Sequence, residues 1–214
     1  MIRNIIWDID GTLFDTYPPI ARAFKNAFEY LGKDVSTERI EKLSKISLDH
    51  CVSTLSTECQ LDKEDIEREF KRYYGKISGE ENPPFSGVVE ICDYICSISG
   101  KNVIVTHRGR EGTVELLSAH NLIDKFAGFI VREDGYPRKP DPASFIALLD
   151  RNNLEREETI NVGDREIDIV AGQSAGIFSC FYGSNLYNVK PDLVVENFED
   201  LYRFILDKNA ELKR

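Results

Sequence analysis

Short runs of β-branched and aromatic residues alternate with helical patterns along most of the chain. The clearest strand-like runs cover residues 5–7, 103–105 and 159–162, and weaker ones cover 129–131, 177–182 and 193–195. Apolar residues at helical spacing occupy the stretches 87–98, 110–120, 142–152, 166–175 and 198–207. Because such alternation connects parallel strands through helical crossovers, it predicts an α/β core with a mainly parallel sheet covered on both faces.

Residues 16–84 interrupt this alternation, because no strand-like run occurs there. Apolar positions between residues 20 and 31 follow a period of about 3.6 residues, which is typical of an amphipathic helix. Further helical patterns cover residues 37–46, 48–57 and 63–77. Asn82-Pro83-Pro84 then stops helix and strand alike. We therefore expect an all-helical insertion, residues 16–84, in an α/β core formed by residues 1–15 and 85–214.

The composition narrows the classes of protein that fit this pattern. The 214 residues include 37 acidic and 27 Lys and Arg side chains, a formal net charge of −10 at pH 7. Such a chain repels nucleic acids and anionic membranes. No apolar run reaches the ~18 residues of a membrane span, and acidic residues within the first ten positions fit no signal peptide. We expect a cytoplasmic protein that binds neither nucleic acid nor membrane, while its oligomeric state stays open.

Two carboxylates and a glycine follow the first strand-like run. In Asp8-Ile9-Asp10-Gly11-Thr12, the two aspartates lie two residues apart, so a strand-like backbone places them on the same face. Crowded carboxylates are unfavourable unless a cation or a proton compensates them. Gly11 allows a sharp turn whose N–H groups face an anion. Because ligands bind outside the carboxyl ends of parallel strands, we interpret this segment as a binding site and not as a solvated acidic turn.

The ends of two other strand-like runs carry further polar groups. Thr106-His107-Arg108 follows residues 103–105 and offers a hydroxyl and cationic or polar groups suited to phosphate oxygens. The segment Gly163-Asp164 to Asp168 follows residues 159–162 and adds two carboxylates. Lys139 lies between these segments, just before a predicted helix. The sequence therefore predicts carboxylates and a lysine gathered at one edge of the sheet.

In this chain order, these residues resemble the four motifs of the haloacid dehalogenase-like superfamily. The motifs are Asp8-x-Asp10-Gly11-Thr12, Thr106, Lys139, and Gly163-Asp164 with Asp168. The helical insertion looks like the cap of the phosphoglycolate-phosphatase and β-phosphoglucomutase branch. Only 32 residues separate Thr106 from Lys139, too few for the large cap that other branches insert there. The resemblance implies a Rossmann-like core and a helical cap that closes over the site, with hinges near residues 15–16 and 82–83.

The resemblance also implies a mechanism. Asp8 would be the nucleophile that attacks phosphorus and forms an aspartyl-phosphate. Asp10 would protonate the leaving group and then deprotonate the water that hydrolyses the intermediate. Mg²⁺ would bind Asp8, the backbone carbonyl of Asp10 and the side chain of Asp164, since it prefers hard oxygen ligands. Asp168 would either bind the metal directly or contact its ligands.

The other motif residues would bind the phosphoryl group. Thr106 would hydrogen-bond to it, and Lys139 would neutralise its charge while holding the nucleophile in place. Backbone N–H groups of Gly11 and Thr12 would complete the cradle, and Arg108 is a further candidate phosphate ligand.

Two residues depart from the family's pattern. His107 stands where Asn is common; it either contacts phosphate or bridges backbone groups, and we favour the bridging role. Arg165 follows Gly163-Asp164, where small polar residues are common, and would alter the mouth of the site. In the insertion, Arg22 and Lys25 form either substrate contacts or a solvated face, and we favour the solvated face.

Together these features predict an enzyme, a Mg²⁺-dependent phosphatase that hydrolyses small phosphomonoesters such as phosphoglycolate or a sugar phosphate. Two alternatives stay open: a phosphomutase of the β-phosphoglucomutase type, and a catalytically silent binding protein on the same fold. A dehalogenase is disfavoured, because that branch lacks the second aspartate, present here as Asp10. The expected partner is a small phosphorylated metabolite, which the sequence does not name.

Overall fold

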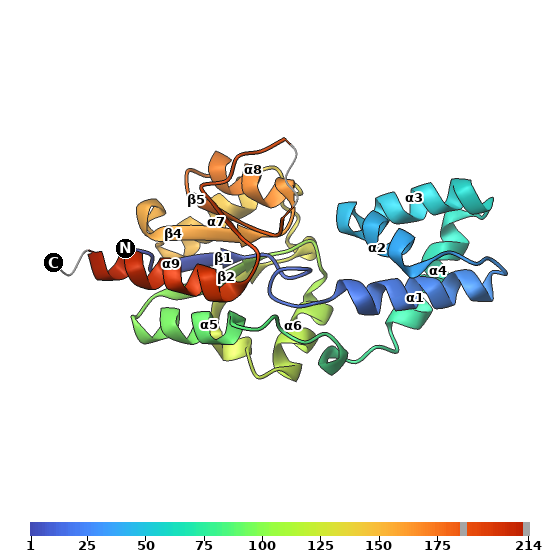
Figure 1. Cartoon of the computed structure of the whole chain (residues 1–214), viewed down its shortest axis with the longest axis horizontal. Helices are drawn as coiled ribbons and strands as arrows, with labels where there is room; N and C mark the ends of the chain where they lie inside the picture. Colours follow the sequence, from blue (N-terminus) through green and yellow to red (C-terminus); the bar gives the residue numbers. More distant parts are fainter. Residues whose placement is uncertain (185–187, 212–214) are drawn as a thin grey trace. The chain divides into compact units, whose positions relative to one another are not determined.

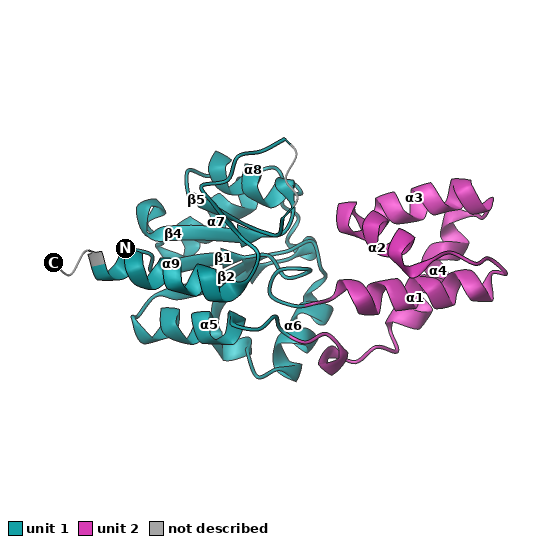
Figure 2. Cartoon of the chain, in the orientation of Figure 1, with its two compact units in different colours: residues 1–14, 84–214 teal, residues 15–83 magenta. Residues whose placement is uncertain are grey.

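The computed structural model describes residues 1–184 and 188–211 of the chain (Figure 1). The chain comprises two compact units, coloured separately in Figure 2: residues 1–14 with 84–214, and residues 15–83. The boundaries expected from the sequence each lie one residue away from this division. Among the described residues, none of the helices combines the length and the apolar composition that crossing a bilayer requires.

The larger unit is built on a parallel sheet. In the described part of the chain, six strands pair in the order β3-β2-β1-β4-β5-β6, and every pair is parallel. The strands are β1 (Asn4–Trp7), β2 (Lys101–Val105), β3 (Phe126–Ile130), β4 (Thr159–Gly163), β5 (Phe178–Tyr182) and β6 (Leu193–Val195). The predicted α/β fold with a parallel sheet is therefore confirmed.

Helices pack on both faces of this sheet (Figure 1). They are α5 (Val88–Ser97), α6 (Arg110–Ala119), α7 (Ala143–Asn152), α8 (Glu166–Ser174) and α9 (Phe198–Glu211). Successive residues of the central strand β1 face opposite sides, as the pleat of a strand requires. Ile5 and Trp7 lie in the same apolar cluster as Ile91 of α5, whereas Ile6 packs in another cluster with Leu148 of α7. Both faces of the strand are thus buried, which explains its continuous apolar run.

Strand β3 begins three residues before the predicted run at 129–131. Its first residues, Phe126-Ala127-Gly128, lack β-branched side chains, so the sequence pattern does not mark them as a strand. Pairing with the neighbouring strand determines where β3 begins, because Asn102 and Val103 of β2 pair with Phe126 and Gly128.

The smaller unit is helical throughout, and residues 15–83 contribute no strand to the sheet. Its helices are α1 (Tyr17–Tyr30), α2 (Thr37–Ile46), α3 (Leu48–Cys59) and α4 (Lys63–Tyr74), followed by a 3-10 turn at Gly79–Glu81. Helix α1 ends at Tyr30, and two residues later Gly32 has a φ of +74°, the left-handed conformation that glycine adopts readily. The Lys33 N–H then donates to the Phe28 carbonyl (2.8 Å), which closes the last turn.

The four helices enclose their own apolar core. Phe24 of α1 and Phe70 of α4 stack with ring centroids 4.0 Å apart, and Ile40 and Leu55 are buried in the same cluster. Helix α4 ends at Tyr74, three residues before the predicted end, because tighter turn bonds replace the helical pattern after Gly75. The unit therefore has the independent hydrophobic core that a separate domain requires.

Candidate active site

The four sequence motifs meet at the carboxyl edge of the sheet. Asp8 follows β1, Thr106 follows β2 and Asp164 follows β4, and these three strands are neighbours in the sheet order. Lys139 lies in the segment between β3 and α7. Because parallel strands all end at the same edge, residues more than 150 positions apart in the sequence come together there.

Lys139 lies at the centre of this cluster. Its Nζ is 2.7 Å from Asp8 Oδ1 and 2.5 Å from Asp168 Oδ1. The ammonium group also donates to the Val105 carbonyl at 3.1 Å. The side chains of Lys139, Asp8 and Asp168 are at most 2% exposed. One buried cation is therefore shared by two buried carboxylates, so removing Lys139 would leave two buried negative charges without the cation between them.

The environment gives these three groups different pKa values. Burial opposes the charge of Lys139, but Asp168 and Asp8 outweigh it and raise the pKa of its ammonium above the ordinary 10.5. For Asp168, burial is outweighed by Lys139 and Arg165, which lower the pKa of its carboxyl below 3.8. Burial raises the pKa of Asp8 above 3.8, and the nearby Asp168 charge adds to that rise against the opposing effect of Lys139. Burial thus disfavours the charged form of Asp8, which further positive charge nearby would stabilise.

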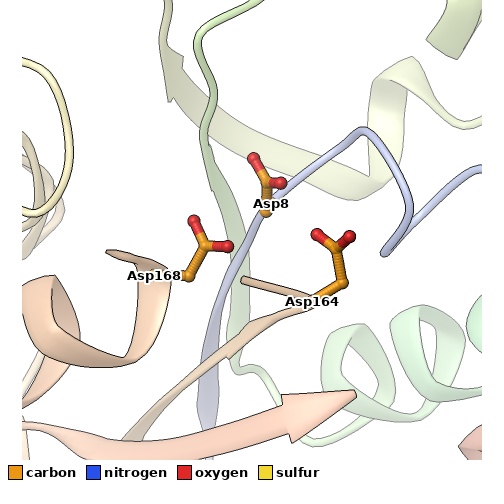
Figure 3. A group of neighbouring side chains, drawn as sticks. All are labelled: Asp8, Asp164 and Asp168. Carbon is orange, nitrogen blue, oxygen red and sulfur yellow. The ribbon is translucent and has the colours of Figure 1, made fainter. Parts of the chain in front are cut away.

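Three carboxylates form a potential cation site beside Lys139. Oxygens of Asp8, Asp164 and Asp168 all lie within 4.8 Å of one another (Figure 3). Asp8 Oδ2 is buried and has no hydrogen-bond partner among the described residues. Buried carboxylate oxygens normally have a partner, so this unpartnered oxygen, in a hard-oxygen donor set, fits a Mg²⁺ ion.

The two other carboxylates of the group are held by the protein. Both oxygens of Asp168 are engaged, Oδ1 by Lys139 and Oδ2 by the backbone N–H of Arg165 at 3.1 Å. This geometry favours the second of the two roles expected for Asp168, contact with the metal's ligands. Asp164 Oδ1 accepts a hydrogen bond from the Thr12 hydroxyl at 3.3 Å. That bond ties the first motif to the fourth.

The carboxylate of Asp10 is not a member of this group of three. Its Oδ1 lies 2.5 Å from a guanidinium nitrogen of Arg108, and both side chains are partly buried. Arg108, a candidate phosphate ligand from the sequence, contacts the carboxylate expected to act as acid and base. The two aspartates of the first motif therefore have different cationic partners, Lys139 for Asp8 and Arg108 for Asp10.

In the turn after β1, the backbone N–H groups of Gly11 and Thr12 form hydrogen bonds within the turn itself. Gly11 has a φ of +77°, which accounts for a glycine at this position. However, its N–H donates to the Phe14 carbonyl (2.9 Å), and the Thr12 N–H donates to the Ile9 carbonyl (3.2 Å). The phosphate contacts expected from these two N–H groups would require both bonds to open.

The second motif is joined to the Lys139 segment through His107. Its Nε2 accepts a hydrogen bond from the Lys139 backbone N–H at 3.0 Å, so the neutral ring carries its proton on Nδ1. Burial, with the charges of Lys139 and Arg165, lowers the pKa of His107 to about 3. Of the two roles left open for His107, this hydrogen bond to the Lys139 backbone agrees with the structural one. Thr106 is buried beside it, and its hydroxyl accepts from the Arg108 N–H at 3.1 Å.

Arg22 and Lys25 of the helical unit lie in ion pairs on its surface. Arg22 pairs with Glu81, and Lys25 pairs with Asp34 and Glu29. These pairings agree with the solvated face favoured from the sequence.

The structure adds two features that the motif residues did not predict. Arg165 places a guanidinium nitrogen 3.6 Å from Asp8 Oδ2, although the only sequence signal was an unusual residue after Gly163-Asp164. Gly163 is required for packing, because a Cβ there would lie 2.3 Å from Asp168 Cβ. A side chain at position 163 would therefore displace the carboxylate that holds Lys139.

Comparison with known proteins agrees with this geometry. A model of the haloacid dehalogenase-like hydrolase family matches residues 5–182. A phosphoglycolate phosphatase of Photobacterium profundum is 28% identical over 94% of this chain and 94% of its own. Pyrophosphatase PpaX of Halalkalibacterium halodurans is 27% identical over 94% of this chain and 91% of its own.

The solved structure of a predicted phosphoglycolate phosphatase from Haemophilus somnus 129pt shares the fold. It has a TM-score of 0.82 at 21% identity and covers 95% of this chain and 98% of its own. The family resemblance expected from the four motifs is thus confirmed. The chain belongs to the haloacid dehalogenase-like hydrolase family, as an enzyme whose curated relatives are phosphatases.

Proposed function

We propose that this enzyme is a Mg²⁺-dependent phosphatase that hydrolyses small phosphomonoesters through an aspartyl-phosphate on Asp8. The observation that carries the proposal is the buried arrangement around Asp8. Lys139 holds its Oδ1 at 2.7 Å, while its Oδ2 is buried without a hydrogen-bond partner among the described residues. Lys139 thus orients the carboxylate through Oδ1, and Oδ2 is available to attack phosphorus or to bind a cation. A purely structural ion pair does not require such an unpartnered oxygen.

The first half of the reaction transfers the phosphoryl group to the protein. A carboxylate oxygen of Asp8 forms a bond to phosphorus while the bond from phosphorus to the leaving oxygen breaks. Asp10, two residues further on, gives its proton to that leaving oxygen. Lys139 stabilises the charge on the phosphoryl oxygens, and Thr106 donates a hydrogen bond to one of them.

The second half releases phosphate. Water attacks the same phosphorus atom, Asp10 takes one of its protons, and the bond between phosphorus and the Asp8 oxygen breaks. Inorganic phosphate leaves, and Asp8 and Asp10 return to their starting states. His107 does not move a proton in this scheme; it holds the Lys139 backbone in place through its 3.0 Å bond.

The metal would be held by Asp8 and Asp164, with the Asp10 backbone carbonyl, as the family motif implies. Mg²⁺ bound there would polarise the phosphoryl group and offset its negative charge. Asp168 would support this site through Lys139 and the Arg165 backbone.

The curated relatives suggest which substrates to examine first. One is named a phosphoglycolate phosphatase and another a pyrophosphatase. Both names refer to small, highly anionic phosphate compounds, so we propose phosphoglycolate and pyrophosphate as the first substrates to test, ahead of phosphates of uncharged sugars.

The test is release of inorganic phosphate from p-nitrophenyl phosphate, phosphoglycolate and pyrophosphate, with Mg²⁺ and without any phosphosugar acceptor. We expect turnover by the wild type, loss of turnover in Asp8→Asn and in Asp10→Asn, and unchanged turnover in the exposed control Asp207→Asn. EDTA should stop turnover and added Mg²⁺ should restore it. Transfer of the phosphoryl group to a sugar hydroxyl, without release of inorganic phosphate, would indicate a phosphomutase. Inactivity across the panel with Mg²⁺, Mn²⁺ or Co²⁺ would contradict the enzyme mechanism.

A further inference from the structure

A small cavity lies beside the catalytic cluster, within the α/β unit. The ends of β2 and β3, the segment before α7 and the start of α7 line it. Its volume is about 40 Å³, and since a water molecule needs about 10–15 Å³ of such space, it has room for a few waters or one small anion. Among the described residues, its lining includes Thr106, His107 and Lys139 but none of the three carboxylates of the potential cation site. The cavity is therefore a neighbour of that site and not a part of it.

His107, on the wall of this cavity, has a ring N–H without an acceptor. A neutral imidazole has one N–H and one acceptor nitrogen. Nε2 is the acceptor, because the Lys139 backbone N–H donates to it at 3.0 Å. Nδ1 therefore carries the proton, and it lies 3.5 Å from a guanidinium nitrogen of Arg138, which is also a donor. Arg138 has a further interaction of its own, so the donor left without an acceptor among the described residues is the His107 N–H.

A second polar group on the same wall is buried without a partner. Ser144, in the first turn of α7, is 3% exposed and lines the cavity. Its Oγ has no hydrogen-bond partner among the described residues. A helical serine often binds a backbone carbonyl of the preceding turn, and buried polar side chains normally have a partner. An unpartnered hydroxyl and an unpartnered N–H thus line one cavity.

The charges around the cavity favour an anion as the missing partner. Among the described residues, none of those lining it carries a carboxylate. Burial lowers the pKa of His107, and the positive charges of Lys139, Arg165 and Arg138 lower it further, whereas Asp168 opposes them. These charges place the ring in a positive potential, which favours a negatively charged acceptor over a water molecule.

We propose that this cavity binds a small oxyanion, a carboxylate or phosphate group, which accepts from the His107 N–H and from the Ser144 hydroxyl. This anion is distinct from the phosphoryl group transferred at Asp8. It is either the second anionic group of a substrate such as phosphoglycolate, in which case the inference rests on the proposed function, or a free anion from solution. Both sources offer the same chemistry, charged oxygen acceptors to which N–H and O–H donors bind strongly.

The experiment follows the ring nitrogens of the chain's three histidines by NMR, in metal-free protein at pH 7, as sodium acetate or inorganic phosphate is added. We expect a saturable shift of the His107 Nδ1 signal with either anion, with His50 and His120 as internal controls. Ser144→Ala removes one hydrogen bond to a charged group and should weaken the affinity about tenfold. Ser144→Leu fills the cavity and should abolish binding. Ser118→Ala, exposed on α6, is the matched control and should bind like the wild type.

Steady-state kinetics with Mg²⁺ identifies the source of the anion. Phosphoglycolate has a carboxylate besides its phosphate, whereas p-nitrophenyl phosphate has a single anionic group. If KM in Ser144→Ala rises more for phosphoglycolate than for p-nitrophenyl phosphate, the cavity holds the second anionic group of the substrate. If the ratio of the two KM values is unchanged while the NMR affinity falls, the cavity holds a free anion.

The outcomes separate this inference from the proposed function. Absence of a saturable His107 shift in the wild type would mean that the cavity holds only water, and would overturn the inference. Equal affinity in the wild type and Ser144→Ala, with thermal unfolding unchanged, would place the anion at the catalytic cluster and overturn it too; Ser144→Ala decides this even if Ser144→Leu does not fold. Neither result affects the proposed function, which turnover of p-nitrophenyl phosphate decides. Binding that Ser144→Ala weakens, in a protein without any turnover, supports the inference and overturns the proposed function.

Discussion

Replacing Lys139 by methionine should destabilise the α/β unit strongly, because the change removes a buried charge without altering the side-chain length much. Lys139 forms ion pairs with Asp8 and Asp168, and all three side chains are almost fully buried. In Lys139→Met the two carboxylates would face each other without the cation between them. Arg165 would remain as a weaker partner, since its contacts are 3.6 and 3.8 Å.

Breaking a buried ion pair by removing one partner costs about 3–5 kcal/mol of stability. The presence of Arg165 places the expected loss near the lower end, at about 3 kcal/mol. For a chain of this size, such a loss lowers the melting temperature by roughly 6–12 °C. Lys208→Met, on the exposed face of α9, is the matched control and should change stability little.

The loss of stability in Lys139→Met should also depend on pH, which distinguishes an electrostatic effect from a packing defect. In the wild type the pKa of Asp168 is lowered, so its charge stabilises the fold above the unfolded pKa near 3.8, and this contribution disappears as the pH falls through the lower folded value. In Lys139→Met, burial is no longer opposed by Lys139, and the pKa of both carboxyls rises. As the pH falls, protonation of these carboxyls removes the repulsion between them in the variant. The difference in free energy of unfolding between the wild type and Lys139→Met is therefore largest near neutral pH and becomes smaller in acid.

The assay is urea unfolding followed by circular dichroism, in EDTA, at several pH values between 4 and 8. The double variant Lys139→Met/Asp168→Asn should recover part of the loss at neutral pH, because one of the unpaired charges is removed. An unfolding midpoint equal to the wild type's at pH 7 would refute the reasoning. A gap that stays constant across the pH range would refute its electrostatic basis.

Two further predictions concern the neighbours of this cluster. Gly163→Ala places a Cβ 2.3 Å from Asp168 Cβ, so it should destabilise the fold by about 1–3 kcal/mol through overpacking; urea unfolding measures this, and a neutral outcome would show that Asp168 shifts freely. His107 has a pKa lowered to about 3 by its burial and by neighbouring cations, so its ring should stay neutral, with the proton on Nδ1, between pH 5 and 8. Nitrogen chemical shifts of the ring measure this directly, and a titration midpoint near 6.5 would contradict the buried bridge to the Lys139 backbone. Because the unfolded chain takes up that proton near pH 6.5, His107 should also make the wild type less stable as the pH falls from 6.5 toward 3.

The positions of most helices and strands follow from local patterns. Buried strands such as Asn4–Trp7 contain short apolar runs, and helix α1 is marked by its apolar period and by Gly32 just after its end. The observed elements differ from the predicted ones where pairing with a neighbouring strand sets the boundary. Strand β3 starts at Phe126 because β2 pairs with it there, although its first three residues include no β-branched side chain.

The residue types of the site were also predicted from the sequence, because carboxylates, a lysine and a threonine at strand ends form a recognisable pattern. The sequence did not predict which of these residues contact one another. Lys139 contacts Asp8 across 131 positions, and Arg108 contacts Asp10 across 98. Which cation meets which carboxylate depends on the order β3-β2-β1-β4 of the strands in the sheet.

The chain's local chemistry is thus enough to establish the kinds of element, the helical insertion and the charged residues at the strand ends, since each depends on a few consecutive positions. The tertiary structure alone decides that Asp8 keeps one buried oxygen without a hydrogen bond among the described residues, that Arg165 faces it, and that the Gly11 and Thr12 N–H groups are occupied within their own turn. Hydrogen bonds and ion pairs depend on distances of a few tenths of an ångström between segments far apart in the chain. No local pattern encodes those distances, because only the packing of the whole sheet and its helices sets them.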